Sequence, residues 1–273
     1  MKVMAVCAHK GGVGKSTTAV QLSCELALRG RRVLGIDCDS QADYTAYTGG
    51  SAQPWEGLDG LLARPSGPLD PRSKLRRARP NLDVLGSSPK LRDVDMRIYE
   101  AVDDGPFLIR RMLGHVADDY DIVVVDVGHS TSIIKNVMAV VDLLVVPTPA
   151  LFPDADHVGD MMQLAAAARS SLGLPKLDML KRSVVSIWRR QPNGTADRIV
   201  IDLLRKTYGD LVAPAIVPNS GYVGHANKER LSIREYRDRY GQKRDRALHA
   251  LVDAYSNLAD FVLERLPQEV AAA

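Results

Sequence analysis

The sequence predicts one α/β domain over residues 1–273, with a doubly wound, mostly parallel sheet flanked by helices. Residues 2–37 read strand, glycine-rich turn, helix and strand, which is the order of a βαβ unit. Strand and helix patterns then alternate along the whole chain, as in doubly wound proteins. The run IVVVD at residues 122–126 has no polar alternation before its aspartate, which is typical of a parallel strand covered on both faces.

The individual elements follow from local apolar patterns and from glycine stops. Residues 2–8 and 31–37 read as short apolar strands, and residues 15–30 between them have apolar side chains at helical spacing and end on a glycine. Further strands are expected at residues 81–88, 120–128, 142–149 and 182–188, with a weaker candidate at 210–218. Further helices are expected at about residues 105–117, 131–140, 155–171, 195–207 and 243–266. Residues 49–80 are rich in Gly, Pro and Arg and are expected to form loops and short helices.

Composition excludes several classes of protein. Hydrophobic residues make up 45% and charged residues 25% of the chain, which is ordinary for a globular protein. No apolar run reaches the length of a membrane span, and the first apolar stretch is too short for a signal peptide. Cys7, Cys24 and Cys38 lack the spacing of metal ligands and are expected to be small buried side chains in a reducing cytoplasm.

Charge is distributed unevenly along the chain. The basic block, residues 181–246, holds 15 lysines and arginines against 7 acids, whereas the whole chain has a net charge of only +3. A basic segment in an otherwise acidic chain indicates a face that binds a polyanion. The alternative is a solvated helix surface on which the charges pair locally.

The segment AHKGGVGKSTT, residues 8–18, has the chemistry of a phosphate-binding loop. A glycine-rich turn that enters a helix directs backbone N–H groups at one point, and the helix dipole adds positive potential there. The expected roles are phosphate binding by the loop backbone, contact of Lys15 with the β- and γ-phosphates, and Mg²⁺ coordination by the Ser16 hydroxyl. The residues expected to hold the nucleotide are Lys10, Gly11, Gly12, Val13, Gly14, Lys15, Ser16, Thr17 and Thr18.

Acidic residues end two of the expected strands and complete this site. Asp126 ends the strand IVVVD and is expected to hold Mg²⁺ through water. Asp37 and Asp39 end the second strand, and residues two apart on an extended segment face the same way, so both can point at the nucleotide. Asp39 is the better placed to orient an attacking water. For Asp37 the alternative to a nucleotide contact is a helix cap or a salt bridge to Lys15.

Lys10 departs from the usual phosphate-loop pattern, which has a glycine at position 9 and no second lysine. A lysine directly before Gly11 cannot easily turn back to phosphates that Lys15 already neutralises. It can reach outward to the ATP of a facing subunit and stabilise charge on the transferring phosphoryl group. The alternative is an ordinary solvated lysine.

The motif KGGVGKSTT resembles the deviant Walker A motif of the ParA/MinD family of P-loop ATPases, in which Lys10 is the signature lysine. Further segments extend the resemblance over the whole chain: DCDSQAD (37–43), YDIVVVDVG (120–128), DLLVVPTPA (142–150), IVP (216–218) and RLSIREY (230–236). It implies a P-loop NTPase fold of the deviant Walker A type, ATP and Mg²⁺ as ligands, and catalytic roles for Lys10, Lys15 and Asp39. It also implies Ser16 and Asp126 at the metal and Pro218 on the adenine side.

Within the family the chain is most similar to the ParA partition ATPases. That resemblance implies a cytoplasmic, nucleoid-associated protein whose ATP-bound sandwich dimer binds DNA without sequence preference. A ParB-like centromere-binding protein would stimulate hydrolysis and release the dimer. Because the first expected strand begins at residue 2, an N-terminal helix-turn-helix domain is not expected. The residues of the basic block expected to contact DNA are Lys228, Arg230, Arg234, Arg237, Arg239, Lys243, Arg244 and Arg246.

Two segments depart from the family pattern. Ser40 and Asp43 replace a proline and an asparagine in the first switch segment, residues 37–43, and Gly128-His129 replaces two prolines in the second. Because proline restricts φ, we expect both segments to be less rigid than in relatives. His129 is either a polar contact near the γ-phosphate or a plain loop residue.

Three alternative functions follow from the same motifs. A MinD-like ATPase that cycles on membranes needs a basic amphipathic C-terminal helix, and LADFVLERLPQEVAAA has one arginine against three acids. A ParA-like ATPase that positions a protein cargo on the nucleoid would have identical chemistry. A metal-inserting ATPase would use cysteine ligands, and the three cysteines lie in expected secondary structure.

Overall fold

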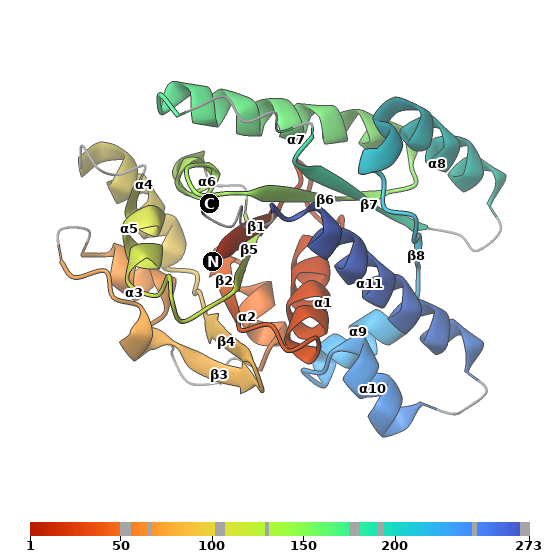
Figure 1. The fold of residues 1–273 in the computed structure, drawn as a ribbon, viewed down its shortest axis with the longest axis horizontal. Coiled ribbons are helices and arrows are strands. Elements are labelled where there is room, and N and C mark those ends of the chain that lie inside the picture. The colour runs from red at the N-terminus through yellow and green to blue at the C-terminus, as the bar shows by residue number, and fades with distance from the viewer. Residues whose placement is uncertain are drawn as a thin grey trace, which may run out of the picture.

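One central sheet organises the described part of the chain (Figure 1). The computed structural model describes residues 1–49, 56–64, 67–101, 107–128, 131–174, 179, 181–189, 194–241 and 245–267. Its strands are β1 (Lys2–Val6), β2 (Val33–Cys38), β3 (Arg76–Arg79), β4 (Leu82–Leu85), β5 (Ile122–Val127), β6 (Leu143–Pro149), β7 (Ser183–Arg189) and β8 (Val217–Pro218). They lie in the order β3-β4-β2-β5-β1-β6-β7-β8, and only β3 is antiparallel to its neighbour.

Helices cover both faces of the sheet (Figure 1). One layer packs on the side of Met4 and Val6 and consists of α1 (Lys15–Leu28), α2 (Asp43–Tyr47), α9 (Tyr222–Lys228), α10 (Ile233–Tyr240) and α11 (Arg246–Arg265). The other packs on the side of Val3 and Ala5 and consists of α3 (Leu58–Leu62), α4 (Leu91–Ala101), α5 (Leu108–Gly114), α6 (Thr131–Met138), α7 (Phe152–Ser171) and α8 (Thr195–Tyr208). The prediction of a doubly wound sheet is confirmed.

The sequence prediction was wrong at several elements. Residues 76–79 form the edge strand β3 where loops and short helices were expected, because the arginine-rich segment RRAR has no apolar alternation and pairs on one side only. Helix α4 was not predicted, although Leu91, Val94 and Ile98 are buried at helical spacing. Helix α10 was also missed, although a capping box at Ser232 and Glu235 begins it.

The C-terminal helix and the last strand are shorter than expected. Helix α11 begins at Arg246 rather than at residue 243, because the carboxylate of Asp245 accepts a hydrogen bond from the Leu248 N–H at 3.0 Å and caps the helix. The weak strand candidate at 210–218 contains only the two residues of β8. Among the described residues, no helix is long and apolar enough to span a bilayer.

The strand order brings the acidic strand ends to the phosphate loop. β5 lies between β1 and β2, and the parallel register places Val6 beside Asp126 and Asp126 beside Asp37. The loop that leaves β1 therefore meets two carboxylates at the carboxyl edge of the sheet. That edge is where open α/β sheets bind their ligands.

A close contact between Gly35 of β2 and Tyr44 of α2 gives a first prediction. A Cβ atom at Gly35 would overlap the Tyr44 hydroxyl and lie 2.7 Å from Cζ, and the ring has no exposed surface into which it could move. We expect Gly35→Ala to lower the free energy of unfolding by about 1–3 kcal/mol, measured by urea denaturation. Gly114→Ala is the matched control, because no heavy atom lies within 4 Å of a Cβ there. Equal stability of the two variants would contradict the packing argument.

Candidate active site

The loop between β1 and α1 has the backbone conformation of an anion cradle. Gly12 and Gly14 have φ of +75° and +85°, a left-handed conformation that glycine adopts readily. Gly14 precedes α1, and no side chain caps that helix, so its first N–H groups point toward the loop. Lys15 begins the helix and is only 7% exposed. Six of the expected residues line one cavity, namely Gly11, Gly12, Gly14, Lys15, Ser16 and Thr17, and their contact with phosphate stays a prediction.

Trp188 of β7 is hydrogen-bonded to this loop. Its indole N–H donates to the carbonyl of Val13 at 3.0 Å, across 175 positions of the chain. The Val13 carbonyl is therefore fixed by a residue of β7. Sequence reasoning missed Trp188, and no local pattern marks a tryptophan in an apolar strand as a partner of a distant loop.

Asp126 carries a buried carboxylate that has no hydrogen-bond partner among the described residues, although it has no exposed surface. Burial, followed by the nearby Asp37, raises the pKa of Asp126 well above its ordinary value, and the nearby Ser16 hydroxyl and Lys15 ammonium only partly oppose this. Two unpartnered carboxylate oxygens beside a serine hydroxyl fit a divalent cation. Mg²⁺ is commonly bound by one or two carboxylates together with substrate phosphates, so Ser16 and Asp126 suffice on the protein side.

This arrangement gives a second prediction. Asp126→Asn removes a buried charge, so we expect the free energy of unfolding without Mg²⁺ and nucleotide at pH 7.5 to rise by about 1–2 kcal/mol. In the same variant, Mg²⁺ with ATP should raise the melting temperature much less than in the wild type. A less stable nucleotide-free variant would show that Asp126 contributes to folding rather than to cation binding.

Asp37 caps the helix α2 from the end of β2. One carboxylate oxygen accepts from the Thr45 N–H at 2.8 Å and from its hydroxyl at 2.6 Å, and the other accepts from the Asp39 N–H at 3.0 Å. The helix-cap alternative is thereby confirmed. Burial raises the pKa of Asp37 to about 6, although these hydrogen bonds lower it. Asp37 thus holds the first switch segment in place.

Asp39 lies over Gly128, the residue that replaces a proline in the second switch segment. A Cβ atom at Gly128 would lie 2.9 Å from Cγ and 3.0 Å from Oδ1 of Asp39. Oδ1 also accepts from the Gln41 N–H at 3.0 Å, which fixes the carboxylate. The absence of a side chain at Gly128 therefore lets the two switch segments touch. His129 lies outside the described residues.

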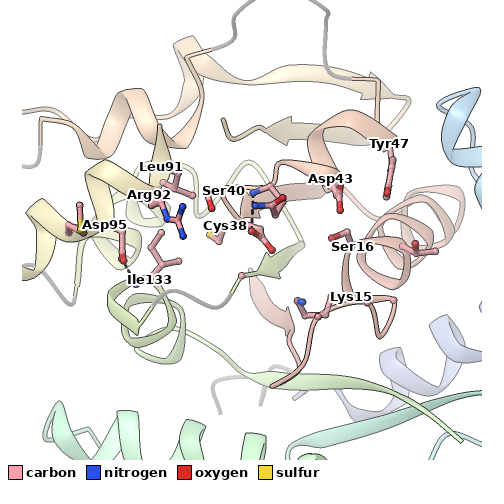
Figure 2. Close-up of a pocket in the computed structure, with 18 residues that line it drawn as sticks. Lys15, Ser16, Cys38, Ser40, Asp43, Tyr47, Leu91, Arg92, Asp95 and Ile133 are labelled. Carbon is pink, nitrogen blue, oxygen red and sulfur yellow. Dashed lines mark hydrogen bonds between the residues drawn. The ribbon is translucent and has the colours of Figure 1, made fainter. Parts of the chain in front are cut away.

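A cavity of about 730 Å³ lies between the phosphate loop, the first switch segment and the helices α4 and α6 (Figure 2). Lys15 and Ser16 line one side, the helix α2 contributes Asp43 and Tyr47, and Leu91, Arg92, Asp95 and Ile133 close the far end. The Asp95 carboxylate accepts from the Ile133 N–H at 3.1 Å, so α4 holds the start of α6. Lys10 is exposed and does not line this cavity.

Pro218 lines a second, smaller cavity on the other side of the loop. That cavity has a volume of about 160 Å³ and is also lined by Gly12, Gly14, Thr17 and Thr18. Trp188 and Tyr255 contribute aromatic rings to its wall. The structure thus brings Pro218 and the loop together, as an adenine-side position requires. Its contact with adenine stays a prediction.

The described residues predicted to bind DNA lie on α9, α10, their connecting turn and the start of α11. We call this set the basic face: Lys228, Arg230, Arg234, Arg237, Arg239 and Arg246. Arg234 makes two hydrogen bonds, of 2.8 and 2.9 Å, with the buried Glu25 of α1, and Arg237 pairs with Asp238. The alternative of local pairing therefore holds for these two, whereas the other four are exposed. Lys243 and Arg244 lie outside the described residues.

Comparisons with known proteins show the family of this chain. The AAA domain family matches residues 1–163, and the chain is 28% identical over 230 residues to the chromosome partitioning protein ParA of Caulobacter vibrioides, with 83% of this chain and 84% of that protein covered. The chain belongs to the ParA-type P-loop ATPases. It is also 30% identical over 221 residues to an uncharacterized protein of Mycobacterium tuberculosis, covering 79% of this chain and 67% of that one.

Solved structures share the fold of this ParA-type ATPase. A plasmid partition protein of Borrelia burgdorferi bound to AMPPNP superposes with a TM-score of 0.74 at 20% identity, over 97% of this chain and 99% of that one. Cobyrinic acid a,c-diamide synthase of Mycobacterium smegmatis, with a bound ATP analogue and magnesium, superposes with a TM-score of 0.77 at 21% identity, over 99% of each chain. Fold neighbours of this family therefore bind nucleotide and magnesium.

Proposed function

We propose that this ParA-type ATPase hydrolyses ATP to ADP and phosphate and uses the cycle to partition DNA. In the proposed cycle, ATP drives formation of a sandwich dimer that binds duplex DNA of the nucleoid without sequence preference. A ParB-like partner then stimulates hydrolysis, and the dimer is released. The observation that carries the ATPase proposal is the buried, unpartnered carboxylate of Asp126 beside Lys15 and Ser16, two residues that line one cavity together with Asp39.

Each side chain has a distinct part in the proposed hydrolysis. Lys15 neutralises the β- and γ-phosphates, and Ser16 and Asp126 hold Mg²⁺, which neutralises further phosphate charge when bound. Asp39 orients a water whose oxygen forms the new bond to the γ-phosphorus. The bond from that phosphorus to the bridging oxygen breaks, and ADP leaves. Lys10 of a facing subunit stabilises the charge that builds up on the transferring group.

DNA binding tests the partition proposal. We expect binding to any duplex in the presence of ATP but not ADP, because dimerisation doubles the number of phosphate contacts. Each phosphate contact adds about 0.9 to the steepness with which log affinity falls against log salt concentration. The DNA affinity should therefore fall steeply between about 50 and 200 mM salt. Fluorescence anisotropy with two unrelated duplexes measures both effects. ATP-bound protein that ignores duplex DNA at low salt would overturn the proposal.

The variant for this test is Lys228→Ala combined with Arg239→Ala, because both side chains are exposed on the basic face. We expect weaker binding to all duplexes alike, with ATP hydrolysis in the absence of DNA intact. Arg97→Ala combined with Arg110→Ala removes the same charge from α4 and α5, on the opposite helical layer, and should leave binding unchanged. Arg234 is a poor choice because it pairs with the buried Glu25, so its loss would also disturb the contact between α10 and α1.

Two alternatives remain distinguishable outcomes. In the first alternative the protein transports a protein cargo instead of DNA. ATP hydrolysis and DNA binding would then be unchanged, but a ParB-like partner would fail to stimulate hydrolysis. A MinD-like membrane cycle requires an accessible apolar helix face. In α11 that face is buried against the sheet and α1 through Leu251, Tyr255, Leu258 and Val262, so vesicles of anionic lipid should not retain the protein.

A further inference from the structure

Arg79 of β3 joins three elements that are far apart in the chain. Its Nε donates to both carboxylate oxygens of Glu235 in α10, at 2.8 and 3.0 Å. One terminal nitrogen donates to the carbonyl of Thr48, at the end of α2, at 3.3 Å, and the other donates to the carbonyl of Arg230 at 2.9 Å. The side chain is 12% exposed. All three guanidinium nitrogens are therefore engaged, each with a different element.

One of those elements, α2, belongs to the nucleotide site. Its residues Asp43 and Tyr47 line the cavity, and Asp37 caps its first turn. Ala42, directly before α2, has a φ of +57°, which is unusual for a residue with a side chain. The helix thus begins beside the phosphate loop and ends, one and a half turns later, at the carbonyl that Arg79 binds.

The other two elements belong to the basic face. Arg230 also has a φ of +57°, and its carbonyl is held by Arg79 while its side chain is exposed. Glu235 accepts from the Ser232 N–H at 2.6 Å and so completes the capping box of α10. Burial raises the pKa of Glu235, but the bonds from Arg79 and Ser232 lower it more, so the net shift is downward. Arg79 therefore contacts Arg230, in the connection between α9 and α10, and Glu235, in the first helical turn of α10.

A second set of contacts attaches α10 to α1. The Ile233 N–H donates to the Gln21 side-chain oxygen at 2.9 Å, and Arg234 pairs with Glu25. α1 starts at the phosphate loop and has a continuous buried face. The start of α10 is thus held between α1 and, through Arg79, the end of α2. A displacement of α2 relative to α1 must break or move the Arg79 junction, because a guanidinium is a rigid planar fork.

We propose that Arg79 is a positioning residue that transmits the nucleotide-dependent position of α2 to Arg230 and α10. The expected change in DNA affinity rests on the proposed function. The expected movement of α10 with the bound nucleotide does not depend on DNA binding. The ligand that selects the α2 position is the nucleoside triphosphate in the cavity. The consequence for the basic face is a change in the orientation of Arg230 and of the first turn of α10.

Amide hydrogen exchange of residues 231–240 tests the coupling without DNA. In the wild type we expect the exchange rates of this segment to differ between the AMPPNP–Mg²⁺ and ADP–Mg²⁺ states. Arg79→Lys keeps one charge for Glu235 but cannot reach both carbonyls, so that difference should disappear while AMPPNP affinity by calorimetry stays within about twofold. No difference in the wild type, or an unchanged difference in Arg79→Lys, would overturn the proposal.

Arg32→Lys is the matched control. Arg32 also bridges distant segments, through the Asp121 carboxylate at 2.7 Å and the Asp118 carbonyl at 2.8 Å, and none of these partners belongs to α2 or α10. It should retain the nucleotide-dependent difference, and loss of the difference in this control too would overturn the specific role of Arg79. If Arg79→Lys fails to fold, Glu235→Gln serves instead, because glutamine preserves the capping box and removes the charge that Arg79 binds.

DNA affinity gives a second and separate readout. Allosteric coupling changes affinity by roughly 5- to 150-fold, so the ratio of DNA affinities in the AMPPNP and ADP states should fall by such a factor toward one in Arg79→Lys. If the wild type shows nucleotide-dependent exchange that Arg79→Lys loses, yet neither protein binds DNA, the positioning role stands and the DNA function fails. If DNA binding keeps its full nucleotide dependence in Arg79→Lys, the positioning role fails.

Discussion

Replacing Lys15 by alanine is expected to abolish ATP binding. Lys15 is nearly buried at the start of α1, where no acid lies in the first turn, and it is the main counter-charge for the β- and γ-phosphates. We expect affinity measured by calorimetry to fall at least about 100-fold, equivalent to about 2.8 kcal/mol. Because the side chain adds little to the apolar core, the variant should still unfold cooperatively. Equal affinity of variant and wild type would remove the phosphate-loop assignment.

Lys10→Ala is the matched control for that experiment, since it removes the same charge five residues away. Lys10 is exposed and does not line the cavity of about 730 Å³, so ATP affinity should change by less than about twofold if its target is the facing subunit's nucleotide. Hydrolysis should nevertheless be lost, by as much as about 10³-fold if Lys10 acts like a cation supplied in trans. Hydrolysis at the wild-type rate would leave Lys10 as a solvated lysine.

Asp39→Ala is expected to bind ATP but to lose hydrolysis by about 10²–10⁴-fold, the range found when a positioned proton acceptor is removed. The carboxylate lines the cavity, and the Gln41 N–H holds it without any direct bond to the phosphate loop among the described contacts. The variant should therefore accumulate as an ATP-bound dimer, seen by light scattering, that remains on DNA. Rapid turnover by this variant would assign water positioning to another residue, with His129 the next candidate.

Two further variants separate the position of Asp39 from its charge. Gly128→Ala keeps the carboxylate but places a Cβ atom 2.9 Å from Cγ, so hydrolysis should fall while ATP affinity is retained. Asp43→Asn removes a different exposed carboxylate from the same cavity and should leave the rate of hydrolysis nearly unchanged. Similar rates for Gly128→Ala and wild type would show that the contact between the switch segments is not needed.

The sequence alone determined the α/β fold class, the phosphate loop and the acidic ends of β2 and β5. These features depend on residues close together in the chain: apolar periodicity, glycines at left-handed positions, and an aspartate directly after an apolar strand. Most strand and helix positions follow from the same local patterns. The edge strand β3 could not be predicted from them, because its arginines leave no apolar alternation. Helix α4 was missed although its buried apolar residues have helical spacing, so the same local patterns could have found it.

Tertiary structure decided what the polar residues of the site do. Asp37 and Asp39 are chemically equivalent in the sequence, but only Asp37 lies beneath α2, where three donors converge on it, and only Asp39 meets the space left by Gly128. Arg79 and Arg234 likewise acquire their partners from segments 156 and 209 positions away. The packing around a buried polar group sets its direction and its partner, because burial of such a group without a partner is costly. Packing also brings together residues that no local sequence pattern relates.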